Sequence, residues 1–309
     1  MQEKSENKLI SFIKSYHTDR FKWNDFFPVP FIIAYVLMQI GAIIIGMIYY
    51  FVLMGMEGSP DYDYYTFLSN YLLFIGIWIV FLLYFMFRSN RPMFGAIGKK
   101  CKGNTLKFLG LGLLVGFATN GLCILIAVLH KDIYLYYEGA NIIKLLILLV
   151  AVFIQSSAEE LICRGFIYQR LRRGYKNPLV AIIGNSIFFG LLHIFNSGVT
   201  PLAIINIVLV GISYSLFVYY CDSIWMPMAA HAAWNFTQNI IFGLPNSGIV
   251  SKFSIFKLDA TTATDSFAYN VGFGVESTIV AAIILLICCV VTVYWGKKNN
   301  KKPTEIWGN

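Results

Sequence analysis

The chain has 309 residues, of which 58% are hydrophobic and only 13% are charged, whereas soluble globular proteins carry about 25% charged residues. The apolar residues gather in blocks about as long as a bilayer is thick, which excludes an ordinary soluble domain and predicts an integral membrane protein. The formal net charge is +8, and the basic residues lie between the apolar blocks. They form no basic stripe interleaved with aromatic residues, so no nucleic-acid partner is expected.

Residues 1–29 are polar and charged, and we expect them to form a cytoplasmic or interfacial segment. Between positions 9 and 27, Lys14, Arg20 and Lys22 are mixed with apolar residues. This pattern favours either a helix lying on the inner membrane surface or a disordered polar tail. The segment is too long for the basic start of a signal peptide, so the first apolar block is predicted to be a retained helix.

The apolar blocks predict an all-α fold, a polytopic membrane bundle of about eight transmembrane helices. The predicted spans are 30–54, 66–87, 106–129, 142–163, 178–196, 201–220, 225–243 and 275–296. The chain then divides into the first three spans (30–139), a core (140–245), and a last part (246–309) with an outer loop, one helix and a basic cytoplasmic tail. Only residues 221–224 join the sixth and seventh spans, which predicts an antiparallel hairpin.

The distribution of Lys and Arg predicts the topology. Twenty of the 24 basic residues lie in 1–29, 88–107, 164–177 and the C-terminal tail. All four segments fall on one side if both termini are cytoplasmic and the number of spans is even, which is the positive-inside pattern. We therefore predict eight spans in a multi-pass protein of the cell membrane. The outer loop, 244–274, is rich in Ser, Thr and Gly, and nothing in it suggests chemistry.

Few ionisable side chains lie inside the predicted spans. Such groups are costly there, at about 2.5–3.5 kcal/mol each on insertion scales, so each is a candidate functional residue. Of the 16 acidic residues, only Glu159 and Glu160 lie well within a span, and Glu276 lies at the start of the last one. Of the four histidines, His193 and His231 are embedded.

The spacing within the fourth span distinguishes the two carboxylates. Glu160 and Arg164 are four residues apart, share a helix face and can form an ion pair. Glu159 projects about 100° away from Glu160 and has no cation on its own helix. A carboxylate without such a partner in an apolar setting is suited to act as a general acid or base.

The fifth and seventh spans carry polar groups at the same helical spacing. Phe189 precedes His193 by one turn, and His231 and Asn235 lie four residues apart on one face. The alanines beside His231 allow neighbouring helices to approach closely. Taken singly, a Glu–Arg pair is typical of structural pairing or of a transport path, and a buried His or Asn is typical of an interhelical hydrogen bond. Their occurrence together on three spans favours a functional site.

Three motifs follow one another on these hydrophobic spans: Glu159-Glu160 with Arg164, Phe189 with His193, and His231 with Asn235. With them, residues 140–245 resemble the CPBP family, which comprises the type II CAAX prenyl endopeptidases and the bacterial bacteriocin-processing or immunity proteins, also called the Abi family. The resemblance implies an intramembrane endopeptidase that acts on a membrane-associated peptide or protein, with an active site that opens toward the cytoplasm.

The resemblance also implies roles for the motif residues. Glu159 is then the catalytic carboxylate, with Glu160 and Arg164 as its supporting pair. His193 is the second group that orients water, and His231 with Asn235 is the polar pair on the substrate side. We expect Glu159 and His193 to hold and deprotonate a water, and His231 and Asn235 to donate hydrogen bonds to the oxyanion.

Other interpretations remain open. Zinc is an alternative, because Glu159, His193 and His231 offer three ligands with water as the fourth, although the chain has no HExxH helix. No other cofactor is implied. The biological role is expected to be bacterial peptide maturation or bacteriocin self-immunity. The non-enzymatic alternatives are an immunity protein that binds without cutting and a transporter that uses the buried Glu, Arg and His groups as a relay.

The depths of the two histidines place a condition on the fold. His231 lies about six residues past the start of its span, or roughly 9 Å, and His193 lies about fifteen residues past Pro178, or roughly 22 Å. We therefore expect the fifth helix to begin well outside the bilayer, so that the two side chains can meet.

Overall fold

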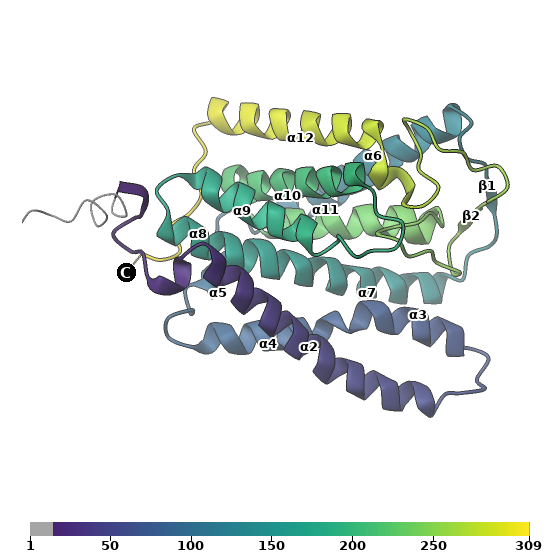
Figure 1. Cartoon of the computed structure of the whole chain (residues 1–309), viewed down its shortest axis with the longest axis horizontal. Helices are drawn as coiled ribbons and strands as arrows, with labels where there is room; N and C mark the ends of the chain where they lie inside the picture. Colours follow the sequence, from purple (N-terminus) through teal and green to yellow (C-terminus); the bar gives the residue numbers. More distant parts are fainter. Residues whose placement is uncertain (1–14, 309) are drawn as a thin grey trace, which may run out of the picture.

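The computed structural model describes residues 15–308, and its elements are almost all helical. The α-helices are α2 (Pro28–Met54), α3 (Tyr62–Leu72), α4 (Phe74–Met86), α5 (Met93–Ile97), α6 (Leu106–Leu129), α7 (Ile142–Glu160), α8 (Tyr168–Gly174), α9 (Pro178–Leu191), α10 (Pro201–Cys221), α11 (Trp225–Asn235) and α12 (Ile279–Lys298). Two π-helical turns, η2 (Leu161–Ile167) and η3 (Phe236–Ile241), continue α7 and α11. The two 3-10 turns are η1 (Trp23–Asp25) and η4 (Gly274–Ser277). The long helices run side by side along one axis (Figure 1).

The surface of the bundle is apolar where a bilayer would surround it. Six helical segments are long and apolar enough to cross a membrane: Pro28–Met54, Tyr62–Met86, Leu106–Leu129, Ile142–Gly174, Pro201–Cys221 and Ile279–Lys298. Only 11% of the most apolar window of the first segment is buried inside the protein. Many large hydrophobic side chains of α2, α6 and α12 are exposed, which soluble monomers avoid. The fold is therefore a polytopic all-helical bundle.

Each of the eight predicted spans coincides with helix, but two are shorter than expected. The span predicted over 178–196 is α9, which ends at Leu191, two residues before His193. The span predicted over 225–243 is α11, whose α-helical part ends at Asn235 before η3 begins. Small and polar residues in α11, together with the turn after α9, limit the length of uninterrupted apolar helix. The number of helices that cross the membrane stays a prediction.

Side-chain caps fix where five of the helices begin. Thr105, Asn141, Asn177, Thr200 and Thr278 each accept a hydrogen bond from a backbone N–H in the first turn of the helix that follows. Such caps satisfy N–H groups that have no partner within the helix. The polar residues between apolar blocks thus define the helix boundaries.

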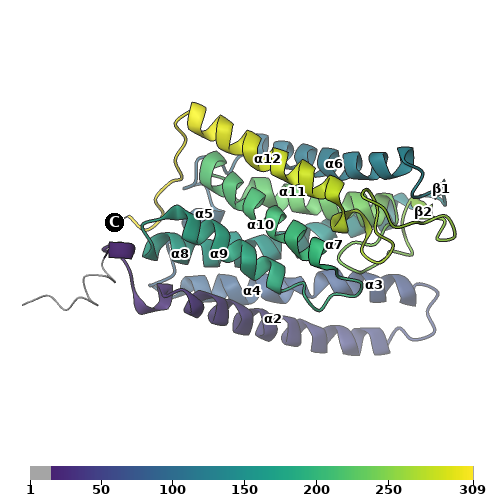
Figure 2. The same ribbon diagram turned by 45° about the horizontal axis from the view of Figure 1, so that its top comes forward.

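The segments rich in Lys and Arg lie at one end of the bundle, together with both ends of the described chain (Figures 1 and 2). The other end carries a small antiparallel hairpin of β1 (Leu135–Tyr137) and β2 (Phe256–Leu258), in which Leu135 pairs with Leu258. The basic segments therefore lie on one side of the bundle, as the positive-inside pattern predicts. The assignment of the basic end to the cytoplasm remains a prediction.

The N-terminal segment is held against α8 by buried charge. The Asp25 carboxylate lies 2.7 Å from Arg173 Nη2 and 3.5 Å from Arg170 Nη1, and all three side chains are buried. Part of the interfacial helix predicted over 9–27 lies outside the described residues. In the described part, His17 forms an isolated β-bridge with Tyr175, and residues 23–25 form the 3-10 turn η1.

Small residues bring α6 and α11 into close contact. A Cβ atom placed on Gly112 would lie 2.2 Å from the carbonyl oxygen of Met226, and one on Gly116 would lie 2.1 Å from that of Ala230. Only glycine fits where backbones approach so closely, as in small-residue interfaces between membrane helices. The close approach predicted from the alanines of α11 is confirmed.

The sixth and seventh spans, α10 and α11, were predicted to pack as a hairpin, but they make only a minor contact with each other. Although α10 and α11 touch, α11 packs mainly against α6 and α7, whereas α10 packs mainly against α9 and α12. The short connection 221–224 joins two helices whose principal partners lie elsewhere. The consequence is that α11 lies beside α7, which carries both glutamates.

We predict that Gly116→Val destabilises the protein, because the new side chain must push the Ala230 backbone away. Overpacking of this kind costs about 1–3 kcal/mol, which corresponds to a fall in Tm of roughly 5 °C. Gly110→Val is the matched control, since no atom lies within 4 Å of a Cβ at that position on the same helix. Thermal unfolding in detergent, followed by tryptophan fluorescence, measures both variants. Equal Tm values would contradict the assigned contact.

Candidate active site

The helices α7 and α11, with the turn after α9, bring the embedded polar residues to one region of the bundle. Glu159 and Glu160 end α7, and Arg164 lies in the π-helical turn η2 that follows. His231 and Asn235 lie on α11, and Asn235 is the last residue before the second π-helical turn, η3. Wide turns of this kind are frequently found at functional sites.

A buried ion pair lies at the base of the site. Glu160 Oε1 accepts hydrogen bonds from Arg164 Nη1 at 3.0 Å and from His231 Nδ1 at 3.1 Å, and the Glu160 and Arg164 side chains are fully buried. The predicted pairing of Glu160 with Arg164 is present. An ionised carboxylate only accepts hydrogen bonds, so the proton of this contact is on Nδ1 of His231.

Arg164 connects this pair to two further helices. Its Nη2 donates to the backbone carbonyl of Gly211 in α10 at 2.9 Å. Its guanidinium carbon lies 5.0 Å from the ring centre of Phe189 and 5.6 Å from that of Tyr214. Cation–π contacts of this kind stabilise a desolvated guanidinium. Arg164 therefore fixes the positions of α9 and α10 relative to the glutamates.

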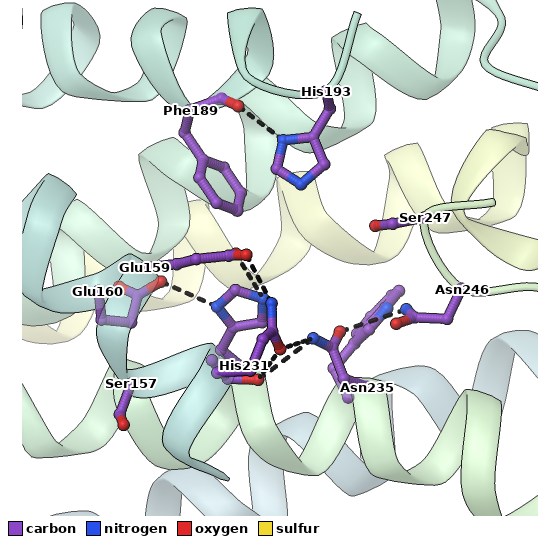
Figure 3. Close-up of polar contacts among 12 residues, drawn as sticks. Ser157, Glu159, Glu160, Phe189, His193, His231, Asn235, Asn246 and Ser247 are labelled. Carbon is purple, nitrogen blue, oxygen red and sulfur yellow. Dashed lines mark hydrogen bonds and ion pairs between the residues drawn. The ribbon is translucent and has the colours of Figure 1, made fainter. Parts of the chain in front are cut away.

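Glu159 points away from this pair and toward a cavity (Figure 3). Its Oε1 accepts a hydrogen bond from Gln155 Nε2 at 2.5 Å, one turn earlier on α7. Its Oε2 lies 3.6 Å from His231 Nε2 and has no hydrogen-bond partner within residues 15–308. As predicted, no cation on its own helix contacts Glu159, but the imidazole of α11 lies beside it.

His193 reaches the same cavity from the turn after α9. Its Nδ1 lies 2.8 Å from the carbonyl oxygen of Phe189, which only accepts hydrogen bonds, so Nδ1 carries the proton. Nε2 is then an acceptor, and the ring extends into the space between Glu159 and Ser247 (Figure 3). Because His193 and His231 line one cavity, the difference in depth predicted from their helices does not separate them.

Asn235 is engaged differently from its expected role. Its Nδ2 donates to Gln155 Oε1 and to Ser156 Oγ, both at 3.2 Å, and its Oδ1 accepts from Asn246 Nδ2 at 3.2 Å. Both donors of the amide are therefore in use within the protein. Through Gln155, Asn235 orients the carboxylate of Glu159.

The outer loop, in which the sequence suggested no chemistry, lines the cavity of the candidate site. Residues Asn246 to Ile249 line the cavity beside His193 and His231. Glu276, in η4, holds this strap (residues 246–249): its Oε2 accepts from the backbone N–H of Ser247 at 2.7 Å, and its Oε1 accepts from Asn246 Nδ2 at 3.0 Å. The cause is tertiary, because the strap folds back over α11.

Glu276 lies outside the membrane-spanning part of α12, and its burial raises its pKa. Removal from water raises the pKa of Glu276 from 4.5 to about 7, against the lowering effect of the hydrogen bonds from Ser247 and Trp234. The charge of nearby Glu159 also raises this pKa, and that of His231 lowers it. Titration of Glu276 therefore falls in the neutral range.

The cavity has a volume of about 450 Å³ and a mixed lining. Met38, Phe74 and Leu192 form apolar walls, and Glu159 and His193 are among its polar groups. It is bounded by the turn after α9 and by the strap, which belong to the end of the bundle away from the termini (Figure 2). The side of the membrane toward which this cavity opens stays a prediction.

The structure thus gathers all six predicted residues, but not as one cluster. Glu159, His193, His231 and Asn235 line the cavity, while Glu160 and Arg164 lie buried behind them. The prediction missed Gln155, Ser156 and Asn246, and it noted Glu276 only as an acidic residue at the start of the last span. Gln155 carried a signal, since it lies one turn before Glu159 on the same face. No local pattern marks Asn246, which reaches the site only through the fold of the loop.

The residues proposed as zinc ligands do not form a metal site. Among residues 15–308, no group of three or more His, Cys, Asp or Glu side chains is arranged to hold a metal ion. Nδ1 of His231 is engaged by Glu160, which leaves only Nε2, 3.6 Å from Glu159 Oε2, as a possible ligand atom of this ring. The donor set therefore does not fit tetrahedral zinc.

The central region of the chain is similar to a known family. Residues 141–237 match the family described as Type II CAAX prenyl endopeptidase Rce1-like, which confirms the resemblance seen in 140–245. The uncharacterized protein YyaK of Bacillus subtilis (strain 168) is 34% identical over 137 residues. The match covers 41% of this chain and 46% of that protein, so it spans less than half of either. No solved structure matches the chain.

The raised pKa of Glu276 predicts how stability depends on pH. The folded protein holds this proton more tightly than the unfolded chain does, so the contribution of Glu276 to stability falls as the pH rises from 4.5 to about 7 and then levels off. The difference in Tm between wild type and Glu276→Gln, measured in detergent from pH 4 to 9, should change over this interval. A constant difference would contradict the assignment.

Proposed function

Because residues 141–237 form a type II CAAX prenyl endopeptidase Rce1-like region, we propose that the chain is an intramembrane endopeptidase of the cell membrane. Glu159 activates a water that cleaves a peptide bond in a membrane-associated peptide or protein. In this proposal the protein serves bacterial peptide maturation or bacteriocin self-immunity.

One observation carries the proposal: Glu159 and His193, each with a hydrogen-bond acceptor, line the same cavity. Glu159 Oε2 has no hydrogen-bond partner in the described structure, and Nε2 of His193 is an acceptor because Nδ1 donates to Phe189. A water that donates one hydrogen to each acceptor presents its oxygen to a carbonyl carbon. This is the arrangement that general-base hydrolysis requires.

The proton movements balance around Glu159. The carboxylate takes a proton from water as the water oxygen bonds to the carbonyl carbon, and the carbonyl electron pair moves to the oxygen. When the C–N bond breaks, Glu159 returns the proton to the leaving amine. In this mechanism His231 acts as an imidazolium with a proton on each ring nitrogen: Nδ1 donates to Glu160, and Nε2 donates to the oxyanion and keeps its proton throughout. Asn235 acts indirectly, by holding Gln155 against Glu159.

The lining of the cavity indicates which part of a substrate it accepts. Met38 and Phe74 contribute apolar surface to the cavity that Glu159 lines. Ligand sites commonly combine apolar walls with a few polar groups that fix the orientation of the ligand. We therefore propose that an apolar side chain of the substrate lies beside the bond to be cut.

We predict that Glu159→Gln abolishes cleavage while the protein stays folded, because the amide cannot take the proton of water. The loss should be at least about 100-fold, the usual contribution of a general base. Membrane peptidomes of cells carrying wild type or Glu159→Gln would identify the substrate, and a synthetic peptide spanning the cleavage site would then give rates. His193→Ala should also lose activity.

Glu57→Gln is the matched control, since it makes the same chemical change at an exposed site between α2 and α3. It should leave the peptidome unchanged. A peptidome that is the same for wild type and Glu159→Gln would overturn the enzymatic proposal. Bacteriocin immunity that persists in Glu159→Gln would instead indicate a protein that binds without cutting.

The donor geometry predicts that metal removal leaves activity unchanged. The purified protein should contain less than one zinc per chain and should keep its cleavage rate after treatment with a chelator and gel filtration. Loss of activity on chelation, with recovery on adding zinc, would show that the histidines rearrange around a metal.

A further inference from the structure

An apolar groove lies between α6, α10 and α12, away from the candidate active site. It has a volume of about 320 Å³ and is lined by Leu111 and Val115 of α6, Phe217 of α10, and Ile287 and Val291 of α12. None of its residues lines the cavity that contains Glu159. From Ile287 to Trp295 it follows α12 for roughly 12 Å, most of the depth of one leaflet.

The groove is continuous with a basic pocket at its end near the termini. This second cavity, of about 180 Å³, shares Phe108, Cys221 and Trp295 with the groove. Three exposed lysines, Lys102, Lys301 and Lys302, line it. They come from the segment before α6 and the segment after α12, so they lie where both helices reach the membrane surface.

The charges of this pocket are available to a ligand. Within residues 15–308, none of the three ammonium groups lies within 4 Å of a carboxylate oxygen, and Lys301 lies over the ring of Trp295 at 5.8 Å. Asp222, the carboxylate in the pocket, already accepts hydrogen bonds from the backbone N–H of Lys102 and from the backbone and hydroxyl of Thr304. The pocket therefore presents unpaired positive charge beside an apolar groove.

We propose that an anionic phospholipid binds here, with an acyl chain in the groove between α6 and α12 and its phosphate among Lys102, Lys301 and Lys302. Basic pockets between membrane helices bind anionic headgroups, and each lysine near the surface strengthens such binding about fivefold. The apolar groove distinguishes this ligand from a soluble anion, which has nothing to place between the helices. The lipid joins α6 to α12 at the end where the C-terminal tail begins.

Native mass spectrometry of the full-length chain in detergent tests the proposal with two probes, dioleoylphosphatidylglycerol and dioleoylphosphatidylcholine. We expect the wild type to retain phosphatidylglycerol preferentially. The triple variant Lys102→Gln, Lys301→Gln, Lys302→Gln should lose this preference, and Val115→Trp, which fills the groove, should lose it without any change in charge. Thermal unfolding and gel filtration check that each variant is folded.

The matched control removes the same number of lysines at the same membrane level but outside the pocket: Lys107→Gln, Lys297→Gln, Lys298→Gln. It should retain phosphatidylglycerol as the wild type does. If both triple variants lost phosphatidylglycerol equally, the proposed site would be wrong, and retention would depend on the overall surface charge. Equal retention of the two lipids by the wild type would also overturn it. So would preferential retention of phosphatidylglycerol by Val115→Trp, or release of phosphatidylglycerol from the wild type on adding inorganic phosphate, since both would mean that the groove does not hold the lipid.

Discussion

The ion pair between Glu160 and Arg164 is the interaction on which the rest of the site depends. Two opposite charges with no exposure to water are costly unless their remaining hydrogen-bonding groups find partners. Here His231 Nδ1 and the Gly211 carbonyl supply some of those partners, so three helices are drawn to one point. Removing either charge would leave the other buried and unpaired. The pair thus sets the positions of α10 and α11 relative to α7.

The fold class could be predicted because a bilayer imposes simple lengths and charge rules on the sequence. Helical spacing correctly paired Glu160 with Arg164 and directed Glu159 elsewhere. It could not show that His231 contacts both carboxylates, because that contact depends on the distance between α7 and α11. The close approach of Gly116 to Ala230 helps to set the position of α11, and neither residue carries a chemical signal of its own.

The remaining errors have one physical origin, which is that loops can supply polar groups from far along the chain. Glu276 and Asn246 are 30 residues apart and meet only because the strap returns over α11. Composition alone marks the strap as an ordinary polar connection. Similarly, α9 ends before His193, so that this residue reaches the cavity from a turn rather than from the helix that hydropathy predicts.

The π-helical turn η2 has a consequence for how this protein tolerates change. Its wider winding alters the angular phase between the half of the helix that carries Glu159 and the half that carries Arg170. Glu159, on the α7 side of the turn, can therefore face α11, while Arg170, on the α8 side, faces Asp25. Deletion of one residue between 161 and 167 would barely change hydropathy. It would, however, rotate the helix face that carries Arg170 relative to the face that carries Glu159, so that the two could not reach Asp25 and α11 together. Sequence length in this stretch is thus as constrained as residue identity.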